Sequence, residues 1–486
     1  MSDQYRPISI PNIGKEAVVR ALRESQATTD TSMFNERETL IDFYEGCQTD
    51  KDQYLKSFFN KETDTMKAPD YPHNLFLTYS NITQKLINEK CKLYKSQPLR
   101  QVNGVEAEKY EEMLEDAFVS TTSKMCDRYN YLLGVIVLAV NPSSSEKKIV
   151  FDIITNNYKL FVLEKDPFKP VGILYRTMSQ DKDGSEIWQY ADSEKYIQFN
   201  SLWEVIDEQL NPVKYFNYIY VPSTKPIRSL YTKDAADIVN ANQAVNVILT
   251  SINNALRLQG FPQMVVTGLT EEEAKNIKTG FDRAITISGA TSGTTPADVK
   301  YITSEANFEQ LFDMIKQQFS LVASIHNLQI EYLITGNIAS GIQLRILKIS
   351  DLEDRQDRID LFKEYFERPL YEICKAIGQN VDGFDPIEEG DLSVDFNDIE
   401  FPKEAEEDQA QWEFDLKTGA KSLIDYLQWL NPDISDEDAE KQLDTNFQIN
   451  KRLTQKFGIN LQSLLEKKKD ESADKMDKTK QKEMMK

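Results

Sequence analysis

The sequence has no apolar run long enough to cross a membrane. Its most apolar segment, residues 132–140, is far shorter than the roughly 20 residues that span a bilayer as a helix. The first residues, from Met1 to Pro7, also lack the apolar core of a signal peptide. We therefore expect a protein that has no membrane partner and is made in a cytoplasm-like compartment.

Histidine and cysteine are scarce. The two histidines, His73 and His326, are too few for a histidine-rich metal site and disfavour a histidine-based acid–base mechanism. No two cysteines form a C-x-x-C pair, which favours free thiols over a zinc site or a redox centre. The cysteines are Cys47, Cys91, Cys126 and Cys374. The sequence thus predicts no catalytic residue, no metal ligand and no bound cofactor.

Positive charge is also in deficit. The chain has 57 Lys and Arg against 79 Asp and Glu, for a net charge of −22. This balance argues against tight wrapping of duplex DNA, which needs clustered basic side chains at the phosphates. It is compatible with a looser enclosure of DNA, because an acidic wall repels phosphates and lets them slide past.

The amino-terminal part, to about residue 130, is predicted to be mostly helical. Apolar residues recur there at spacings of three and four, which is typical of an amphipathic helix. In one of these helices Leu75, Tyr79, Ile82 and Leu86 share a face, and Pro98 is expected to prevent its continuation. The predicted helices are 14–24, 35–44, 74–94, 106–119 and 123–132.

Residues 134–221 are predicted to form strands, because β-branched and aromatic runs alternate there with turn residues. Residues 181–184, Asp-Lys-Asp-Gly, resemble a calcium loop only faintly, since the glycine is two positions too early and the closing glutamate is missing. We interpret them as a hairpin turn. The predicted strands are 134–140, 149–154, 158–163, 172–178, 187–190, 195–199 and 215–221.

The centre of the chain carries the most informative pattern. A helix at 233–259, a small β-containing module at 260–303 and a second helix at 304–334 are followed by a glycine-bearing break at 335–341 and a third helix at 342–377. Asparagines recur along the first helix, which indicates either a face that meets something polar or ordinary helix packing. The charged middle of the third helix is predicted to reach solvent or a subunit interface.

Two features of this central region are interpreted as structural and not as functional. His326 falls on the apolar face of the second helix and is predicted to be a packed, hydrogen-bonded histidine. Within the module, residues 289–296 look like a phosphate-binding loop but lack its Gly-Lys-Ser/Thr ending, so we predict a surface loop. The module is otherwise predicted to contain strands at 263–267, 284–288 and 299–303 and a helix at 271–281.

After Gly378 the chain becomes acidic. Between Asp382 and Asp415 the only base is Lys403, which indicates a solvated face; metal binding is the weaker alternative, because no ligand spacing supports it. The predicted elements are strands at 393–396 and 399–401 and helices at 404–418, 420–429 and 436–450. From residue 466 the polar, mixed-charge tail is predicted to be disordered.

The order of these features resembles a portal protein of a tailed bacteriophage, of the SPP1-like or a related type. The resemblance is spread over nearly the whole chain in short motifs, and Gln343 stands where the family commonly has alanine. Ser96 and Gln97 stand where it commonly has glycine. The matching segments are Arg37 with 43–46, 74–75 with 90–99, 134–137, 221–222 with 233–246, 340–344, 396–406 and 416–422.

The resemblance implies an α+β, predominantly α subunit with wing, stem, clip and crown regions, assembling into a ring that usually has twelve copies. In this chain the wing would be 1–226, with its long helix and return strands at 342–403. The two stem helices would be 227–259 and 304–331, with the clip at 260–303 between them. The remaining regions would be the tunnel loop at 332–341, the crown at 404–465 and a disordered tail at 466–486.

The implied function is that of a passive conduit in the virion and not of an enzyme. Such a ring sits at one capsid vertex after assembly in the host cytoplasm, nucleates the procapsid, and passes double-stranded DNA during packaging and ejection. The sequence shows no nucleotide site, so a partner would hydrolyse ATP. The implied partners are further copies of the chain, the major capsid protein, the scaffolding protein, the large terminase subunit, and a head-completion adaptor or tail protein.

The resemblance also places candidate functional residues. The DNA-facing tunnel loop would contain Thr335, Gly336, Asn337, Ile338, Ala339 and Ser340. The stem channel would be lined by Lys233, Asn246, Asn253, Arg257 and Lys316. Partners would dock on the clip at Glu271, Glu272, Glu273, Lys275 and Lys278.

Two other classes of function remain open at this point. An acidic, metal-dependent hydrolase or nuclease would use the carboxylates of 382–408 as ligands, but would need them to converge on a rigid scaffold. A helical scaffold protein with no role in DNA handling is the third reading.

Overall fold

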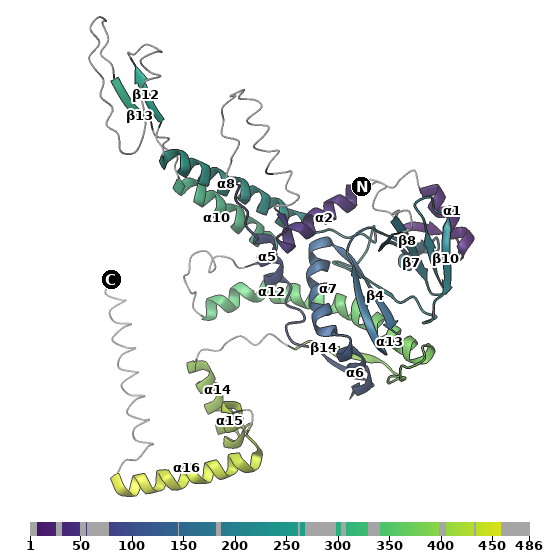
Figure 1. Ribbon diagram of the computed structural model, residues 1–486. Helices are drawn as coiled ribbons and strands as arrows, with labels where there is room; N and C mark the ends of the chain where they lie inside the picture. Colours follow the sequence, from purple (N-terminus) through teal and green to yellow (C-terminus); the bar gives the residue numbers. More distant parts are fainter. Residues whose placement is uncertain are drawn as a thin grey trace, which may run out of the picture. The chain divides into compact units, whose positions relative to one another are not determined.

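A computed structural model of the chain describes residues 7–25, 32–48, 55, 77–143, 145–180, 186–260, 263–267, 298–302, 308–328, 341–397, 405–431 and 434–457 (Figure 1). It is a mixture of helix and sheet, as the sequence predicts. The chain forms two units, Met1–Ile399 (unit 1) and Glu400–Lys486 (unit 2).

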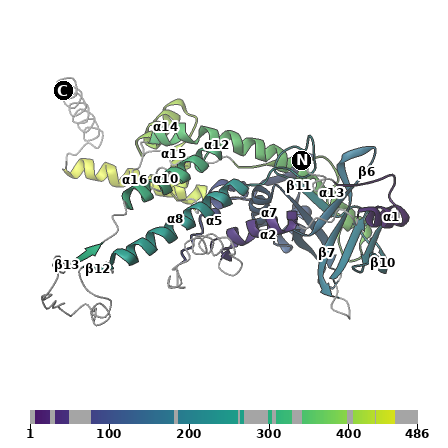
Figure 2. The same cartoon turned by 90° about the horizontal axis from the view of Figure 1, so that it is seen from above.

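A six-stranded sheet lies at one end of unit 1, in the order β1-β6-β7-β8-β9-β10. Strands β6 to β10 form an antiparallel meander, and β1 adds to its edge in parallel with β6. Helix α1 (Lys15–Ser25) lies beside these strands in Figure 2 and packs Val18 and Leu22 against Phe161 and Leu174. The strands are β1 (Ile8–Ile10), β6 (Tyr158–Leu163), β7 (Asp166–Gln180), β8 (Glu186–Asp192), β9 (Lys195–Phe199) and β10 (Val205–Leu210).

A three-stranded sheet, β11-β4-β5, forms the middle layer. Its central strand β4 (Val135–Ser143) is buried on both faces, which explains its uninterrupted apolar run. Val135 and Val137 point to the six-stranded sheet, whereas Ile136 and Leu138 point to a layer of helices. The flanking strands are β5 (Lys148–Ile154) and β11 (Tyr218–Pro222).

The helical layer contains the core of unit 1. It is completed by a long helix in three parts, α12 (Gly341–Phe362), a π-helical turn (Lys363–Glu367) and α13 (Arg368–Asn380). Pro369, the second residue of α13, has no backbone N–H and so cannot donate a hydrogen bond to the carbonyl oxygen four residues earlier. The π-helical turn before it is wider than an α-helical turn, and the helix therefore continues through the proline. The other helices are α2 (Ser32–Glu45), α5 (Ile82–Lys90), α6 (Glu108–Asp116) and α7 (Val119–Leu133).

Two motif residues of the resemblance have structural roles in these layers. Arg37 on α2 is buried and donates to the carbonyl oxygens of Leu133 and Thr155 and to the hydroxyl of Tyr158, so it joins three elements. Gly134 opens β4 with φ +77°, and a Cβ there would lie 2.4 Å from the carbonyl oxygen of Thr232. Only glycine fits this position, because any side chain would collide with rigid backbone.

Two smaller sheets complete unit 1. Strand β14 (Leu392–Asp395) pairs with β2 (Leu99–Val102), which pairs with β3 (Val105–Glu106). Strand β12 (Gln263–Thr267) pairs antiparallel with β13 (Asp298–Ile302). Unit 2 contains α14 (Ala405–Thr418), α15 (Leu423–Leu430) and α16 (Asp436–Phe457).

The structure corrects several predicted elements. In the described part of the helix predicted at 74–94, residues 77–94, only α5 is helical, and the backbone of residues 77–81 is bound instead by side chains of a neighbouring helix. Strand β10 was not predicted, since Val205–Leu210 is half polar, almost fully exposed and lacks a clear alternation. Helix α16 extends to Phe457 and not to residue 450.

Candidate functional site

The candidate site is the pair of helices α8 (Ala236–Gly260) and α10 (Phe308–Ile325), which lie side by side in Figure 1. Strand β12 begins three residues after α8 ends, and β13 ends six residues before α10 begins. Because Gln263 pairs with Ile302, the β12–β13 ladder joins the two helices at one end and they run antiparallel. The predicted order of helix, β-containing module and helix is therefore confirmed for the described residues.

Helix α10 has two apolar stripes. The first, which includes Ile315 and Val322, faces α8 and the core. The second consists of Met314, Leu321 and Ile325, spaced by seven and four residues, so that all three lie on one side of the helix. Each of the three is about half exposed or more, at 49%, 60% and 57%. An apolar stripe of this kind is typical of a helix that packs against a further element.

Helix α8 holds residues 77–83, which comprise a non-helical stretch (77–81) and the first two residues of α5, through a ladder of polar side chains. Asn242 accepts hydrogen bonds from the backbone N–H groups of Ile82 and Thr83 and donates to the carbonyl oxygen of Ser80. The other rungs follow at intervals of about one helical turn: Asn246 accepts from the Ser80 N–H, Thr250 from the Thr78 N–H, and Asn253 donates to the Thr78 hydroxyl.

The spacing of this ladder has a geometric reason. Four residues of helix advance about 6 Å, and two residues of extended chain advance about 6.6 Å. Partners therefore stay in step as the segment runs antiparallel to the helix, with residues 82, 80 and 78 opposite 242, 246 and 250. Asn242 also caps the first turn of α5, whose leading N–H groups have no partner within their own helix.

These contacts decide between the two readings of the asparagine-rich helix. The amide face of α8 is packed within the chain, because Asn242 and Asn246 are buried and Asn246 also donates to Gln48. Asn246 and Asn253, predicted to line a channel, thus have intrachain partners. Lys233 is exposed and lies 3.8 Å from Asp237, and Lys316 is exposed and lies 3.5 Å from Asp313. Arg257 lies on α8, but its side chain is outside the described residues.

The second helix ends earlier than predicted, at Ile325 and not near residue 334. Asn327 adopts a left-handed conformation, with φ 54°, and the N–H of Leu328 donates to the carbonyl oxygen of Ala323. This is the bonding pattern of a Schellman motif, with the buried Leu328 as its apolar contact. Asparagine tolerates this conformation better than most residues, and that was the missed signal.

The turn after α10 is fastened to the body of unit 1 by three contacts. His326 Nδ1 lies 2.6 Å from the hydroxyl oxygen of Tyr131, and its Nε2 lies 3.1 Å from a carboxylate oxygen of Asp237. Asn327 donates to Asp354 on α12, which also accepts from Lys90 on α5. His326 is therefore a partly buried, hydrogen-bonded histidine, as predicted.

The charged middle of the third helix is exposed at Glu353 and Asp357, as predicted, but Arg358 is bound within the chain. Arg358 forms an ion pair with the buried Asp127 and lies over the ring of Tyr131. Burial acts to lower the pKa of Arg358, but the charge and hydrogen bond of Asp127 raise it above its ordinary value. The amino-terminal part of this helix is thus tied to α7, next to the turn that follows α10.

A second buried ion pair fixes the π-helical turn. Both oxygens of the Glu367 carboxylate accept hydrogen bonds from the Arg100 guanidinium, at 2.8 Å and 3.1 Å. One of these oxygens also accepts a hydrogen bond from the Tyr94 hydroxyl. Arg100 and Glu367 are 1% and 0% exposed. A two-pronged pair of this kind has fixed geometry, and removal of one partner leaves a buried charge without compensation. The long helix is therefore anchored rigidly to β2.

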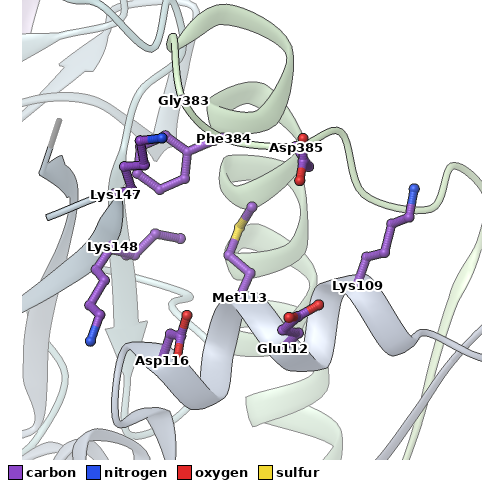
Figure 3. Close-up of a pocket in the computed structure, with 10 residues that line it drawn as sticks. Lys109, Glu112, Met113, Asp116, Lys147, Lys148, Gly383, Phe384 and Asp385 are labelled. Carbon is purple, nitrogen blue, oxygen red and sulfur yellow. The ribbon is translucent and has the colours of Figure 1, made fainter.

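Figure 3 shows a surface pocket of about 240 Å³ elsewhere in unit 1, between α6, the β4–β5 turn and the chain after α13. Met113 points into it, and Lys109, Glu112, Asp116, Lys147, Lys148 and Asp385 surround it. The charges are mixed and lie on exposed side chains, so the pocket does not bring together an acid and a base for catalysis.

The acidic segment after α13 has structural contacts where it is described. The Glu388 carboxylate accepts from the backbone N–H groups of Lys109 and Tyr110, and it thereby caps the amino terminus of α6. Asn103 donates to the carbonyl oxygen of Glu389 and accepts from the N–H of Asp391. Among the described residues, no group of three or more His, Cys, Asp or Glu side chains is arranged to hold a metal ion. None of the described helices is both long and apolar enough to span a membrane.

Several predicted features lie outside the described residues. They include the tunnel-loop residues 335–340, the clip residues 271–278, the helix at 271–281, the strands at 284–288 and 399–401, the turn at 181–184, the loop at 289–296 and the tail at 466–486. These remain predictions.

No family model matches the chain, and no curated protein matches it. Its structural neighbours are chains of gene transfer agent (GTA) particles. A chain of the native GTA virion is 11% identical, with a TM-score of 0.40 over 70% of this chain and 87% of that one. A chain from the neck of the empty particle, computed with C6 symmetry, is 10% identical, with a TM-score of 0.42 over 72% of this chain and 89% of that one. A chain from the neck of the native particle, computed with C12 symmetry, is 12% identical, with a TM-score of 0.40 over 72% of this chain and 89% of that one. TM-scores below 0.5 do not assign an assembly or an activity to this chain.

Proposed function

We propose that this chain is the subunit of a portal ring at one vertex of a bacteriophage-type capsid, through which double-stranded DNA enters and leaves. The observation that carries the proposal is the antiparallel helix pair α8–α10, joined at one end by β12–β13 and followed by the long helix α12–α13. The same order of elements is implied by the motif resemblance for stem, clip, stem and wing helix.

The second apolar stripe of α10 supports self-association. In a ring with one rotation axis, the same two different surfaces meet at each contact, so a subunit needs one exposed patch and one receiving surface. Met314, Leu321 and Ile325 supply an exposed patch on a helix whose other side is already covered by α8. In this proposal the stripe packs against the stem of the next copy.

The fastened turn after α10 supports a role for the segment that follows it. His326, Asn327 and Leu328 fix the chain before this segment, and α12, which follows it from Gly341, is held further along by Arg358. The proposed tunnel loop thus begins shortly after a fastened turn and leads into a helix anchored in unit 1. In the proposed ring, residues 335–340 contact DNA, the clip at 260–303 docks terminase and later the head-completion adaptor, and residues 404–465 form the crown.

Charge is consistent with a conduit. Twelve copies at −22 each would carry about −264 charges, and such a wall surrounds DNA without trapping it. ATP hydrolysis belongs to a partner in this proposal, and the subunit itself is not an enzyme. A metal-dependent nuclease gains no support from Glu388, whose carboxylate is engaged as a helix cap.

The test is the assembly state of the purified full-length chain. Negative-stain electron microscopy and sedimentation velocity are expected to give closed rings with a central channel and about twelve copies. A stable monomer at high concentration would contradict the portal proposal and favour a helical scaffold. A divalent-dependent cleavage of DNA that is lost in Asp395→Ala would favour the nuclease.

The tunnel loop is tested separately. Deletion of 337–340 is expected to leave rings intact and to impair retention or packaging of DNA, because the deleted residues contribute to the channel and not to the ring contact. Loss of rings in this variant would show that the segment is misassigned.

A further inference from the structure

The carboxyl-terminal half of α16 is uncovered on every side. Within α16, each residue from 445 to 456 is exposed, whereas Ala439 and Leu443 in the first half are buried or half-buried. This half, the arm, still carries large apolar side chains, with Phe447 72% exposed and Ile449 and Leu453 close to 40%. A helix of this length that packs against nothing is marginal in water, so the arm needs a partner.

The charge of α16 is divided between its two halves. The first half contains Asp436, Glu437, Asp438, Glu440 and Asp444 against one base, and the arm contains only bases, Lys451, Arg452 and Lys456. Compensation of the helix dipole accounts for acids in the first turn and bases in the last. It does not account for Glu440, Asp444, Lys451 and Arg452, which lie further inside the helix.

Unit 2 also offers a surface of the opposite kind. Phe414 on α14 and Leu423 and Leu430 on α15 are each more than half exposed. Leu423 and Leu430 are seven residues apart and lie on the same side of α15. Residues 405–430 contain six acids and two bases, a net charge of −4, and the arm carries +3. The apolar stripe and the charge of the arm both match this surface, the α14–α15 face.

The arm does not reach this face in its own chain. Helix α15 contacts α16, and Gln428 on α15 donates to Asp436 at the start of α16. On a straight helix Leu453 is about 15 Å beyond Leu443. The same face on a second copy has no such restriction.

We propose that the arm of one copy packs on the α14–α15 face of a second copy, with Lys451 and Arg452 beside acidic residues of that face. The contact joins two different surfaces, so each copy gives one arm and receives one. The closed number of copies rests on the proposed portal ring, but the contact itself does not.

Cross-linking of the full-length chain tests the contact. In a Cys47→Ser background, which removes the exposed native thiol, Leu453→Cys and Leu430→Cys chains are mixed and treated with a bismaleimide. The expected product is a covalent dimer with one chain of each kind. A mixture of Leu453→Cys with Leu210→Cys, which is even more exposed (77% against 56% for Leu430) and lies in unit 1, is the control and is expected to give none.

Charge reversal gives a second measurement. Lys451→Glu with Arg452→Glu is expected to weaken self-association at least tenfold in sedimentation velocity, and adding Glu413→Lys, at an exposed acid of α14, is expected to restore part of the loss. Lys147→Glu with Lys148→Glu makes the same change of charge on two exposed, adjacent lysines of unit 1 and is expected to leave association unchanged.

The outcomes separate this contact from the portal proposal. Mixed dimers without rings in the microscope would support the contact and overturn the portal. Rings without mixed dimers, and with association unaffected by Lys451→Glu and Arg452→Glu, would overturn the contact and leave the portal standing. A loop-closing product within one chain that carries both Leu453→Cys and Leu430→Cys, with no product between chains, would show that the arm packs on its own chain and would also overturn the contact.

Discussion

Unit 1 and unit 2 treat their apolar side chains in different ways. Unit 1 buries three clusters of them between its sheets and helices, around residues such as Leu138, Tyr158 and Phe366. Among the described residues of unit 2, only Asp415 and Ala439 are buried, and Trp412, Tyr426 and Trp429 stack on one another at the surface. Unit 1 therefore has the core of an independently folding body, whereas unit 2 leaves its apolar area for an assembly.

The helix pair α8–α10 stands between these extremes. Helix α8 is covered by α10 and by the segment 77–83, and α10 is covered on one side only. The pair is thus stable within the subunit and still has a stripe to bury in a contact. Four substitutions test this difference in how apolar and charged side chains are covered, from the largest expected effect to the smallest.

The largest effect is expected in the core of unit 1. Arg100→Met leaves the Glu367 carboxylate buried without its partner and is expected to lower the free energy of unfolding by about 3–5 kcal/mol. Denaturant unfolding followed by tryptophan fluorescence in a Trp412→Phe, Trp429→Phe background reports on unit 1 alone, through Trp188 and Trp203.

Two further variants control this prediction. Arg176→Met breaks the exposed pair with Glu186 and is expected to cost less than about 1 kcal/mol. Adding Glu367→Gln to Arg100→Met is expected to recover stability, because no buried charge then remains. An equal loss in the Arg100 and Arg176 variants would show that the buried pair does not anchor the long helix.

The next effect concerns the ladder on α8. Asn242→Ala removes the cap of α5 and the bond to Ser80 and is expected to cost about 2 kcal/mol in the same measurement. Asn240→Ala serves as the control, because Asn240 is an exposed asparagine of the same helix, and is expected to stay within about 0.5 kcal/mol. Equal losses would mean that the ladder does not hold residues 77–83.

A smaller effect is expected from a substitution in the exposed apolar stripe of α10. This substitution is expected to weaken assembly and to leave folding unchanged. Leu321→Glu places a charge in the proposed ring contact and is expected to weaken association at least tenfold, or about 1.4 kcal/mol, with unfolding of unit 1 unchanged. Ser320→Glu, at an exposed polar position beside it, is expected to assemble normally. A loss of folding in Leu321→Glu would show that the stripe belongs to the core.

The smallest effect is expected at the surface of the six-stranded sheet. Hydrogen bonds from Lys15 and Lys195 lower the pKa of Glu208 to about 2, below the value near 4.3 of an unfolded glutamate. The contribution of Glu208 to the stability of the folded state is therefore fully present above about pH 4.3 and is lost as the pH falls toward 2. The group is exposed, so solvent screens the pair.

The measurement is the difference in melting temperature between the wild type and Glu208→Gln across this pH range. The difference is expected to be small at pH 7 and to vanish at pH 2. A difference that grows as the pH falls would contradict the assignment of the charged form as the bonded one.

Much of the secondary structure could be predicted from local patterns. The β-branched runs located β4, β5, β6 and β9, and the three-and-four spacing located α1, α2 and the long third helix. The order of helix, module and helix at the centre also followed from spacing alone. Elements without a periodic pattern were less predictable: Val205–Leu210 does not alternate between apolar and polar residues and is a strand because it pairs with β9.

The sequence alone determined where the chain could form helices and strands, since periodicity and turn chemistry act over a few residues. It also determined the net charge, which disfavours tight DNA binding. Only the tertiary structure decided what each face meets. Asn246 is bound to Ser80, 166 residues away, and Arg100 to Glu367, 267 residues away. The reason is that a side chain's partner depends on how distant segments pack, and no local pattern records that packing.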